Sequence, residues 1–357
     1  MKNIDSYLNG DGARAVIFGG AGAEHDISRL SACGFIAEAE QLNFDILPIF
    51  VDKNGDFYIY VGDTSEIGDI SRAINRDALL PTFPTRLSGK CGFAFGGGII
   101  QVSLAVPVLH GDFGEDGRVQ GLLECAGIRL AGADTVSGAV MSDKAYSKAV
   151  AAAAGVKTLP WLVCTIGEFS ADASALVGRV VLEIGLPAFI KPTGLGSSIG
   201  AAAAYSESEI YVALERAFSV SERVMAEPLL QGKRELECAF FDMHGKRVIS
   251  HPAEVITQGG FYDYGRKYLN TDEVRLSVHA DVPGSVASLV RKTSGVLAAA
   301  LGARHIARFD YFLAGNGELY FNEVNSFPGL TSGSLYTRML AECGIGYSDF
   351  VRFMLTV

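Results

Sequence analysis

The sequence lacks the cysteine patterns that mark disulfide-bonded and zinc-binding proteins. Its six cysteines are scattered, and no two of them form a Cys-x-x-Cys pair. Cysteines without paired spacing are typical of reduced thiols in a cytosolic protein. The first twelve residues carry acids and glycines where a signal peptide would be apolar. We therefore expect a cytoplasmic protein.

Long apolar runs and an excess of basic charge are also missing. No stretch approaches the roughly 18 consecutive apolar residues of a membrane span, so we expect no contact with a membrane. The 30 basic residues are outnumbered by 40 acidic ones, which gives a net charge of −10. Nucleic-acid binders need a basic footprint, so nucleic acid is not expected as a partner. A small anionic substrate is compatible with this charge, because a few local cations suffice to bind it.

The first part of the chain has the pattern of an open α/β sheet. The 357 residues, 49% of them hydrophobic, are enough for two or three domains. An apolar strand over 15–18 runs into Gly-Gly-Ala-Gly, a helical pattern covers 27–42, and a second apolar strand covers 45–51. This order favours a parallel sheet, whose ligands bind at the carboxyl ends of its strands. A further strand, 106–109, ends at His110.

The rest of the chain alternates short strands with helices. Strands are predicted at 187–192, 224–230 and 236–241, and a long helix at 284–301. We place domain boundaries near residues 140 and 230. The predicted domains are 1–140, 141–230 and 231–357.

Two β-rich runs, 306–313 and 319–324, form the strongest motif. They flank Asn316-Gly317, and Asn-Gly is the preferred two-residue turn of a β-hairpin. Such a turn pairs Gly315 with Glu318 and fixes every other pair of the hairpin. A bulge at the turn would shift this pairing.

The predicted pairing gathers four polar side chains on one face. Asp310 lies opposite Glu323, and Arg308 lies opposite Asn325; residues two apart on a strand share a face. Two facing carboxylates with Cβ atoms roughly 5 Å apart repel each other, and a bound cation removes the conflict. Carboxylate and amide oxygens suit Mg²⁺. The alternative is a set of solvent-facing polar residues on a two-sided sheet.

A glycine- and serine-rich loop, Gly194–Gly200, follows the strand that carries Lys191. Its glycines let the backbone approach a ligand closely, and successive N–H groups can then hold phosphate oxygens. Lys191 would add a fixed positive charge. The loop matches neither a Walker loop nor a dinucleotide fingerprint, so a surface turn is the alternative. Lys144, taken alone, has the pattern of a solvated helix lysine.

Glu24 and His110 both follow strands at the same edge of the predicted sheet, where ligands bind. Each also has a structural interpretation. Glu24 could stabilise the N-terminus of the next helix, and a lone histidine is usually structural or solvated. The aromatic and cationic loop 259–269 could be a lid that excludes water, or its aromatic rings could anchor it to the core.

Eight motifs, taken in order, resemble those of the D-alanine–D-alanine ligase family, over nearly the whole chain. They are VIFGGAGAEHDIS, VPVLHGDFGEDGRVQG, MSDKAYSK, FIKPTGLGSSIG, GKRELECA, FYDYGRKYL, ARFDYF and FNEVNSFPGLTSGSLY. The resemblance implies the three-domain ATP-grasp fold, in which an open parallel α/β sheet domain precedes two α+β domains that clasp ATP. It also implies a homodimeric, cytoplasmic enzyme of peptidoglycan precursor synthesis. ATP and two Mg²⁺ ions, with Mn²⁺ as a substitute, are the implied cofactors.

The resemblance also implies which residues bind the nucleotide. The matching positions are Lys144 and Lys191 for the phosphates, Gly196, Ser197 and Ser198 for the loop that covers them, Glu227 and Leu230 for adenine, Glu235 for ribose, and Lys267 and Asn322 for further contacts. One extra residue lies between Glu227 and Glu235 compared with the family. Glu237 is therefore an alternative to Glu235.

Substrate and metal positions follow from the same resemblance. Those positions are Glu24 for the ammonium group of the first D-alanine, His110 near its carboxylate, Arg308 and the Gly329 backbone N–H for the tetrahedral intermediate, Ser334 and Leu335 for the second substrate, Ser197 and Tyr268 for active-site ordering and loop closure, and Asp310, Glu323 and Asn325 for the metal. The last three lie on the face that the hairpin pairing predicts.

The implied reaction passes through an acyl phosphate. The carboxylate of the first D-alanine attacks the γ-phosphate of ATP and releases ADP, and the amine of the second D-alanine then displaces phosphate from the acyl phosphate. Within this class, D-serine and D-lactate are alternative second substrates. Lys267 and Tyr268 argue against lactate, and Leu335 favours a methyl side chain over that of serine.

Two alternatives come from other classes of protein. A catalytically inactive ATP-binding regulatory protein would have lost Arg308 or a metal carboxylate, and neither is lost. An ATP-grasp carboxylase or another amine ligase would keep the ATP and metal residues. It would not keep Glu24, His110 and Ser334-Leu335 together.

Overall fold

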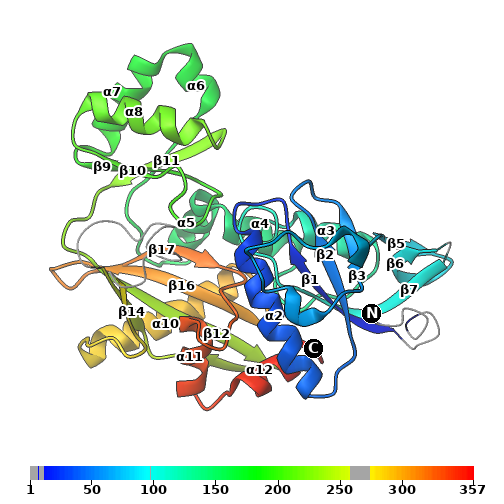
Figure 1. Cartoon of the computed structure of the whole chain (residues 1–357). Helices are drawn as coiled ribbons and strands as arrows, with labels where there is room; N and C mark the ends of the chain where they lie inside the picture. The colour runs from blue at the N-terminus through cyan, green and yellow to red at the C-terminus, as the bar shows by residue number, and fades with distance from the viewer. Residues whose placement is uncertain (1–6, 8–11, 97, 258–273) are drawn as a thin grey trace.

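Three β-sheets organise the chain (Figure 1). The computed structural model describes Tyr7 and residues 12–96, 98–257 and 274–357. The predicted lid, 259–269, lies outside the described residues. In Figure 1 the second sheet and its helices stand above the other two sheets, which lie side by side.

The first sheet has seven strands in the order β4–β3–β2–β1–β7–β6–β5. The strands are β1 (Ala13–Gly19), β2 (Ile46–Val51), β3 (Phe57–Tyr60), β4 (Leu79–Pro81), β5 (Phe83–Leu87), β6 (Lys90–Phe95) and β7 (Gly98–Pro107). The central strands β2, β1 and β7 are parallel, as predicted. The outer strands on both sides, β3 and β4 on one and β6 and β5 on the other, are paired antiparallel, so the sheet is mixed rather than wholly parallel.

Helices cover both faces of this first sheet. They are α2 (His25–Gln41) and α3 (Arg118–Cys125), with short 3₁₀ turns η1 (Thr64–Glu66) and η2 (Arg76–Ala78). Alternate side chains of β1 point to opposite faces of the sheet, as strand geometry requires. Phe18 packs in a core with Phe35 of α2, and Ile17 packs in another core with Leu123 of α3.

The second sheet has four antiparallel-paired strands in the order β10–β9–β11–β8. Its elements are β8 (Leu162–Thr165), α6 (Ile166–Ala171), α7 (Ala173–Glu183), β9 (Ala188–Pro192), β10 (Ala202–Ala204), α8 (Glu207–Phe218) and β11 (Arg223–Pro228). Its buried residues form a separate core that draws on this segment alone. The second sheet is therefore a small independent layer attached to the rest of the chain.

The third sheet runs β15–β14–β12–β16–β17, with β13 also paired to β12. Its elements are β12 (Arg234–Met243), β13 (Lys246–Ile249), β14 (Ala253–Thr257), β15 (Val274–Ser277), α10 (Gly284–Ala300), β16 (Ile306–Leu313) and β17 (Leu319–Asn325). Two earlier helices, α4 (Thr135–Ser142) and α5 (Lys144–Ala153), pack against β17. Met141 and Ala151 thus share the core of this sheet. The division at residues 140 and 230 stays a prediction.

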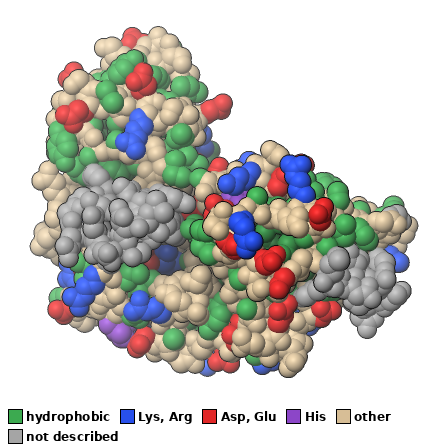
Figure 2. Space-filling model, in the orientation of Figure 1, with side chains coloured by type: hydrophobic (Ala, Val, Ile, Leu, Met, Phe, Trp, Pro, Cys, Tyr) green, Lys and Arg blue, Asp and Glu red, His purple; other side chains and the backbone are tan. Residues whose placement is uncertain are grey.

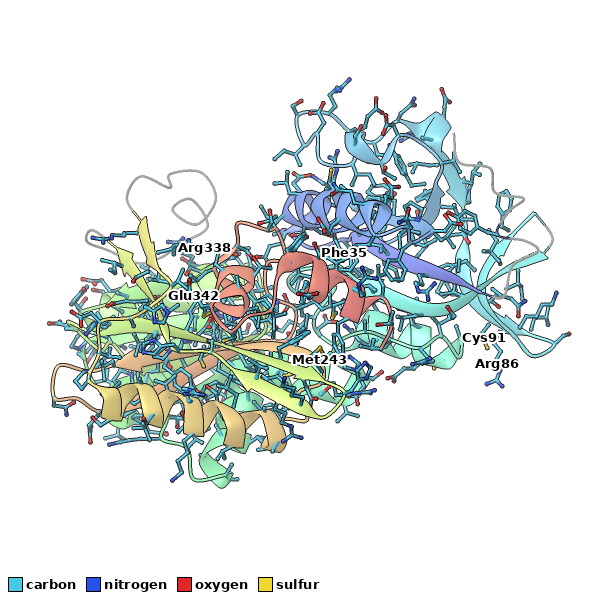
Figure 3. All side chains as sticks on the ribbon, turned by 90° about the horizontal axis from the view of Figure 1, so that it is seen from below. Phe35, Arg86, Cys91, Met243, Arg338 and Glu342 are labelled. Carbon is cyan, nitrogen blue, oxygen red and sulfur yellow. The ribbon has the colours of Figure 1, made fainter. Side chains whose placement is uncertain are left out.

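The C-terminal helices connect the first and third sheets. They are α11 (Leu335–Glu342) and α12 (Tyr347–Met354). Figure 3 shows them between α2, which carries Phe35, and the third sheet. The ring centroid of Phe350 lies 6.5 Å from that of Phe35 and 5.8 Å from that of Phe241 on β12. One continuous core therefore joins these two sheets.

The charged residues of the β16–β17 hairpin pair as predicted, although the turn that joins the two strands differs from the prediction. Asp310 pairs with Glu323 and Arg308 pairs with Asn325, which confirms the prediction. The two-residue turn was wrong: the Ala314 N–H donates to the Glu318 carbonyl, which makes a three-residue loop with Gly317 at φ +83°.

A β-bulge corrects the shift that this longer turn introduces. Tyr311 pairs with Phe321, whereas Asp310 pairs with Glu323, so Asn322 is the extra residue on β17. The three-residue turn and the bulge each displace the register by one, in opposite senses. The charged face of the hairpin is consequently where the simple pairing predicted it.

The core between β12 and α12 depends on Phe241. Its ring is fully buried and lies 4.8 Å from that of Phe353, centroid to centroid. Phe241→Ala should lower the free energy of unfolding by about 3–5 kcal/mol in urea titrations, because a cavity remains. Leu182, which is 85% exposed, provides the control: Leu182→Ala should change it by less than about 0.5 kcal/mol. Equal effects of the two changes would contradict the packing described.

Candidate active site

Two cavities adjoin where the three sheets meet. The first cavity lies between the edge of the first sheet and residues 323–329 and includes Glu24 and His110. The second cavity lies between the second and third sheets and includes Lys191 and Phe312. Both cavities are bounded by Lys144, Leu195, Gly196, Ser197, Arg308 and Glu323. A ligand in one cavity can therefore react with a ligand in the other across these shared residues.

Glu24 lies in the first cavity beside the glycine-rich loop of the second sheet. Its side chain is buried, and its Oε1 accepts a hydrogen bond of 2.7 Å from the Ser197 hydroxyl. Gly111, which comes after β7 in the chain, has a φ angle of +75°. A Cβ atom at this residue would lie 2.5 Å from Glu24 Oε2. Only glycine leaves this carboxylate in place. The contact between Glu24 and Ser197 holds the loop over the first cavity.

His110 connects the first sheet to the end of β17. Its Nδ1 is 3.0 Å from the Phe327 carbonyl oxygen, and its Nε2 is 3.0 Å from the Ser31 hydroxyl. A carbonyl only accepts, so Nδ1 carries the proton and donates. His110 is buried beside Glu24 at the carboxyl edge predicted from the sequence.

Glu115 reinforces the same connection, and the sequence reasoning missed it. Its carboxylate accepts backbone N–H bonds of 3.1 Å from Gly111 and from Phe327, one on each oxygen. A carboxylate that accepts from two separate segments fixes their spacing. Glu115 lies within the quoted HGDFGEDG motif, so its position among turn-forming glycines was the available signal.

The glycine- and serine-rich loop is held in an uncommon conformation. Ser197 and Ser198 have φ angles of 52° and 56°, a left-handed region that residues with a Cβ rarely occupy. The Lys144 Nζ donates to the Leu195 carbonyl at 2.8 Å, and the Lys144 backbone N–H donates to Thr193. The loop is thus fixed by Lys144 on one side and by Glu24 on the other.

Cations offset the two facing carboxylates of the hairpin. Arg308 donates two hydrogen bonds of 2.7 Å to Asp310, and the Lys144 Nζ lies 3.2 Å from Glu323 Oε2. Burial alone would raise the pKa of Glu323, but Lys144, Lys191 and Arg308 outweigh it and hold that pKa at about 2. Glu323 is therefore ionised at neutral pH.

The chemistry of the donor set fits a hard divalent cation. Asp310, Glu323 and Asn325 offer two carboxylates and an amide on one face, beside a loop suited to phosphate. Mg²⁺ usually takes few protein ligands and keeps water or phosphate oxygens in its other positions. Over the part of the chain that the structure describes, no cluster of three or more His, Cys, Asp or Glu side chains could hold a metal. Two carboxylates and one amide would leave coordination positions open for phosphate oxygens.

Lys191 lies at the wall of the second cavity, between a carboxylate and an amide. Its Nζ is 2.7 Å from Glu227 Oε1 and 3.0 Å from the Asn322 side-chain oxygen. Lys148 binds the other oxygen of Glu227. Burial alone would raise the pKa of Glu227, but the two lysines hold it at about 2. The Glu227 carboxylate is thus occupied by two ammonium groups, so the adenine contact that the resemblance implies would fall to its backbone.

Glu235 and Glu237, the alternative positions for ribose, have different surroundings on β12. Glu235 pairs with Phe312, and its carboxylate contacts the Lys233 ammonium at 2.8 Å. Glu237 pairs with Asp310, and its Oε2 lies 3.1 Å from Arg308 Nε. Both line the second cavity, but the Glu235 side chain is 29% exposed, whereas Glu237 is 9% exposed and lies at the charged face. This geometry favours Glu235 for ribose.

Among the described residues, Gly329 is the last predicted position that lines a cavity, and Ser334, Leu335 and Leu230 line neither. Gly329 lines the first cavity. Ser334 caps α11 by accepting from the Thr337 N–H, and Leu335 is buried in the core that joins the first and third sheets. Leu230 follows β11 and is half-buried. Lys267 and Tyr268 lie outside the described residues.

Basic and acidic side chains are mixed on the described surface. On the face in Figure 2, basic side chains are interspersed with acidic ones. Among the described residues, no helix has the length and apolar character needed to cross a membrane. Two adjoining cavities with lysines, an arginine and facing carboxylates can join an anionic substrate to a phosphate donor.

Comparison with known proteins agrees with this chemistry. Residues 14–133 match a family described as D-ala D-ala ligase N-terminus, and residues 150–356 match D-ala D-ala ligase C-terminus. A D-alanine–D-alanine ligase of Pseudarthrobacter chlorophenolicus is 33% identical over 94% of this chain and 91% of its own. One from Chlorobaculum tepidum is 31% identical over 96% and 95%.

Solved structures give the same result. A D-Ala:D-Ser ligase, VanG, from Enterococcus faecalis has a TM-score of 0.86 and 30% identity, covering 97% of this chain and 99% of its own. D-alanyl-alanine synthetase A from Vibrio cholerae has a TM-score of 0.82 and 28% identity, covering 97% of each. These likenesses confirm the ATP-grasp fold predicted from the motifs, and they imply ATP and a divalent metal as cofactors. The chain belongs to the D-alanine–D-alanine ligase family.

Proposed function

We propose that the chain joins two D-alanines into D-alanyl-D-alanine, at the cost of ATP, for peptidoglycan precursor synthesis. One observation carries the proposal: the cavity with Glu24 and His110 meets the cavity with Lys191 at Lys144, Arg308 and Glu323. A carboxylate in the first cavity can thus reach a phosphoryl group in the second. The names of the relatives support D-alanine as the substrate.

In this proposal the first D-alanine binds in the first cavity. Its ammonium group binds the Glu24 carboxylate, and its carboxylate lies near His110 and points to the shared residues. Ser197 holds Glu24 in position through their hydrogen bond. The substrate is thereby oriented before any charge develops, which lowers the barrier without direct chemistry by these residues.

The phosphates of ATP bind between the glycine- and serine-rich loop and two lysines. Lys144 and Lys191 offset the negative charge, and the N–H groups from Gly196 to Ser198 donate to phosphate oxygens. Asp310, Glu323 and Asn325 would hold two Mg²⁺ ions, or Mn²⁺ in their place, which supply charge neutralisation to the phosphates. Glu227, Leu230 and Glu235 would contact the nucleoside, the first through its backbone.

Arg308 and the Gly329 N–H stabilise the oxyanion that forms when the second amine attacks the acyl phosphate. Burial opposes the charge of Arg308, but Asp310 and Glu237 raise its pKa well above the usual value, so it stays protonated. Ser334 and the backbone of Leu335 would hold the second substrate at the start of α11, because the Leu335 side chain is buried in the core. The loop-closing role that the resemblance implies for Lys267 and Tyr268 concerns residues outside the described part of the chain. The enzyme would be a cytoplasmic homodimer, as the resemblance implies.

A D-alanine–D-serine ligase is the second candidate, because the VanG structure resembles the chain over almost its whole length. The resemblance assigns the choice between the two candidates to position 335, although here the Leu335 side chain is buried in the core that joins the first and third sheets and lines neither cavity. A leucine at this position supplies no hydrogen bond to a serine hydroxyl, and an unpaired buried hydroxyl is disfavoured. D-alanine is therefore the expected second substrate.

Purified protein with ATP, Mg²⁺ and D-alanine should release phosphate and form a dipeptide, measured by phosphate assay and mass spectrometry. Competition with D-serine and D-lactate identifies the second substrate. The expected product is D-alanyl-D-alanine. Absence of phosphate release with D-alanine, alone or with either competitor, would refute the ligase assignment.

Glu323→Ala should abolish turnover because it removes one of two facing carboxylates of the metal site. Its circular dichroism spectrum should match that of the wild type, since Glu323 is outside the apolar core. Glu318→Ala is the matched control: this glutamate lies just before the same strand and pairs with Lys157 at the surface. The control should keep near-normal activity. Normal activity of Glu323→Ala would refute the metal site.

A further inference from the structure

Lys148 is a fully buried lysine with no role in the function proposed above. It lies on α5 four residues after Lys144, so the two lysines share a face of the helix. Lys144 reaches the junction of the cavities, and Lys148 points deeper, where it binds the Glu227 carboxylate. Buried lysines are rare unless paired, because desolvation disfavours their charge. A fully buried lysine beside the second cavity therefore indicates a specific role.

We propose that Lys148 positions the phosphate-binding lysine Lys191 by fixing the carboxylate of Glu227. The proposal rests on the function assigned above, in which Lys191 binds a phosphate group of ATP. Lys148 itself touches no substrate: it lines neither cavity. It is a positioning residue that acts through Glu227 and Lys191.

The contacts form a chain from the helix to the cavity wall. Lys148 binds Glu227 Oε2, and Lys191 binds Glu227 Oε1 at 2.7 Å. Lys191 then contacts Asn322, the bulge residue next to Glu323. On the sheet, Glu227 pairs with Phe189 and Lys191 pairs with Met225, so Glu227 and Lys191 are diagonal neighbours on one face. One carboxylate thus bridges a lysine from α5 and a lysine from β9.

The two lysines bind both carboxylate oxygens of Glu227 and so fix the orientation of its side chain. Its side chain is 2% exposed, so no solvent can replace a lost donor. Without Lys148, Oε2 would be an unsatisfied acceptor in a dry environment, and Glu227 would turn or bind a proton. Lys191 would then lose its charged anchor and keep the neutral contacts with the Asn322 amide oxygen and the Phe189 ring. The predicted consequence is a defect in nucleotide binding, separate from any loss of stability.

Lys148→Met tests the proposal, because methionine keeps the apolar stem without the ammonium group. ADP binding, measured by isothermal titration calorimetry on the full chain, should weaken about tenfold or more, the scale of one lost charge-assisted hydrogen bond. The KM for ATP should rise by a similar factor. The KM for D-alanine should change less than about twofold, because the first cavity is untouched. Lys292→Met, at an exposed lysine on α10, is the control and should leave all three values unchanged.

A double variant, Lys148→Met with Glu227→Gln, separates positioning from charge balance. It removes both members of the buried pair, so thermal stability should recover toward that of the wild type relative to Lys148→Met. ADP binding should stay weak, because glutamine offers Lys191 no charge. Unchanged ADP affinity in Lys148→Met, or its recovery in the double variant, would overturn the proposal. A wild type that binds ADP but releases no phosphate with D-alanine would instead contradict the proposed function, while the ADP comparison would still test Lys148.

Discussion

The repulsion between Asp310 and Glu323, which face each other across β16 and β17, constrains the whole site. Two carboxylates in a partly buried place need cations, and the fold supplies them from separate elements. Arg308 comes from the same hairpin and Lys144 from α5. A metal ion with its phosphate ligands can share this negative charge, so the carboxylate pair makes the site ready for ATP. The pairing of one hairpin thus determines where a ligand in one cavity can react with a ligand in the other.

The remaining contacts hold three separate segments around that pair. Glu24 of the first sheet binds Ser197 of the second, and His110 and Glu115 bind the backbone at Phe327. These hydrogen bonds cross between sheets whose apolar cores are only partly shared. Polar contacts of this kind fix position without large buried area, which suits a site that must admit and release substrates.

Sequence reasoning predicted the charged face correctly, although its turn was wrong. Asn-Gly suggested a two-residue turn, and only the fold shows that the bulge at Asn322 restores the pairing. Motif order predicted the family and the fold, because the family match covers most of the chain. The role of Lys148 could not be predicted from the sequence, because a buried lysine and a solvated lysine have the same pattern in a helical segment. The occupied carboxylate of Glu227 could not be foreseen for the same reason: its partners come from α5 and β9.

The central claim is that the carboxylate of the first substrate receives a phosphoryl group where the two cavities meet. Turnover of D-alanine labelled with ¹⁸O in its carboxylate tests this most directly, with the released phosphate analysed by mass spectrometry. Formation and breakdown of an acyl phosphate should transfer one labelled oxygen from the substrate to each phosphate. Phosphate that carries no label, released together with dipeptide, would contradict the account.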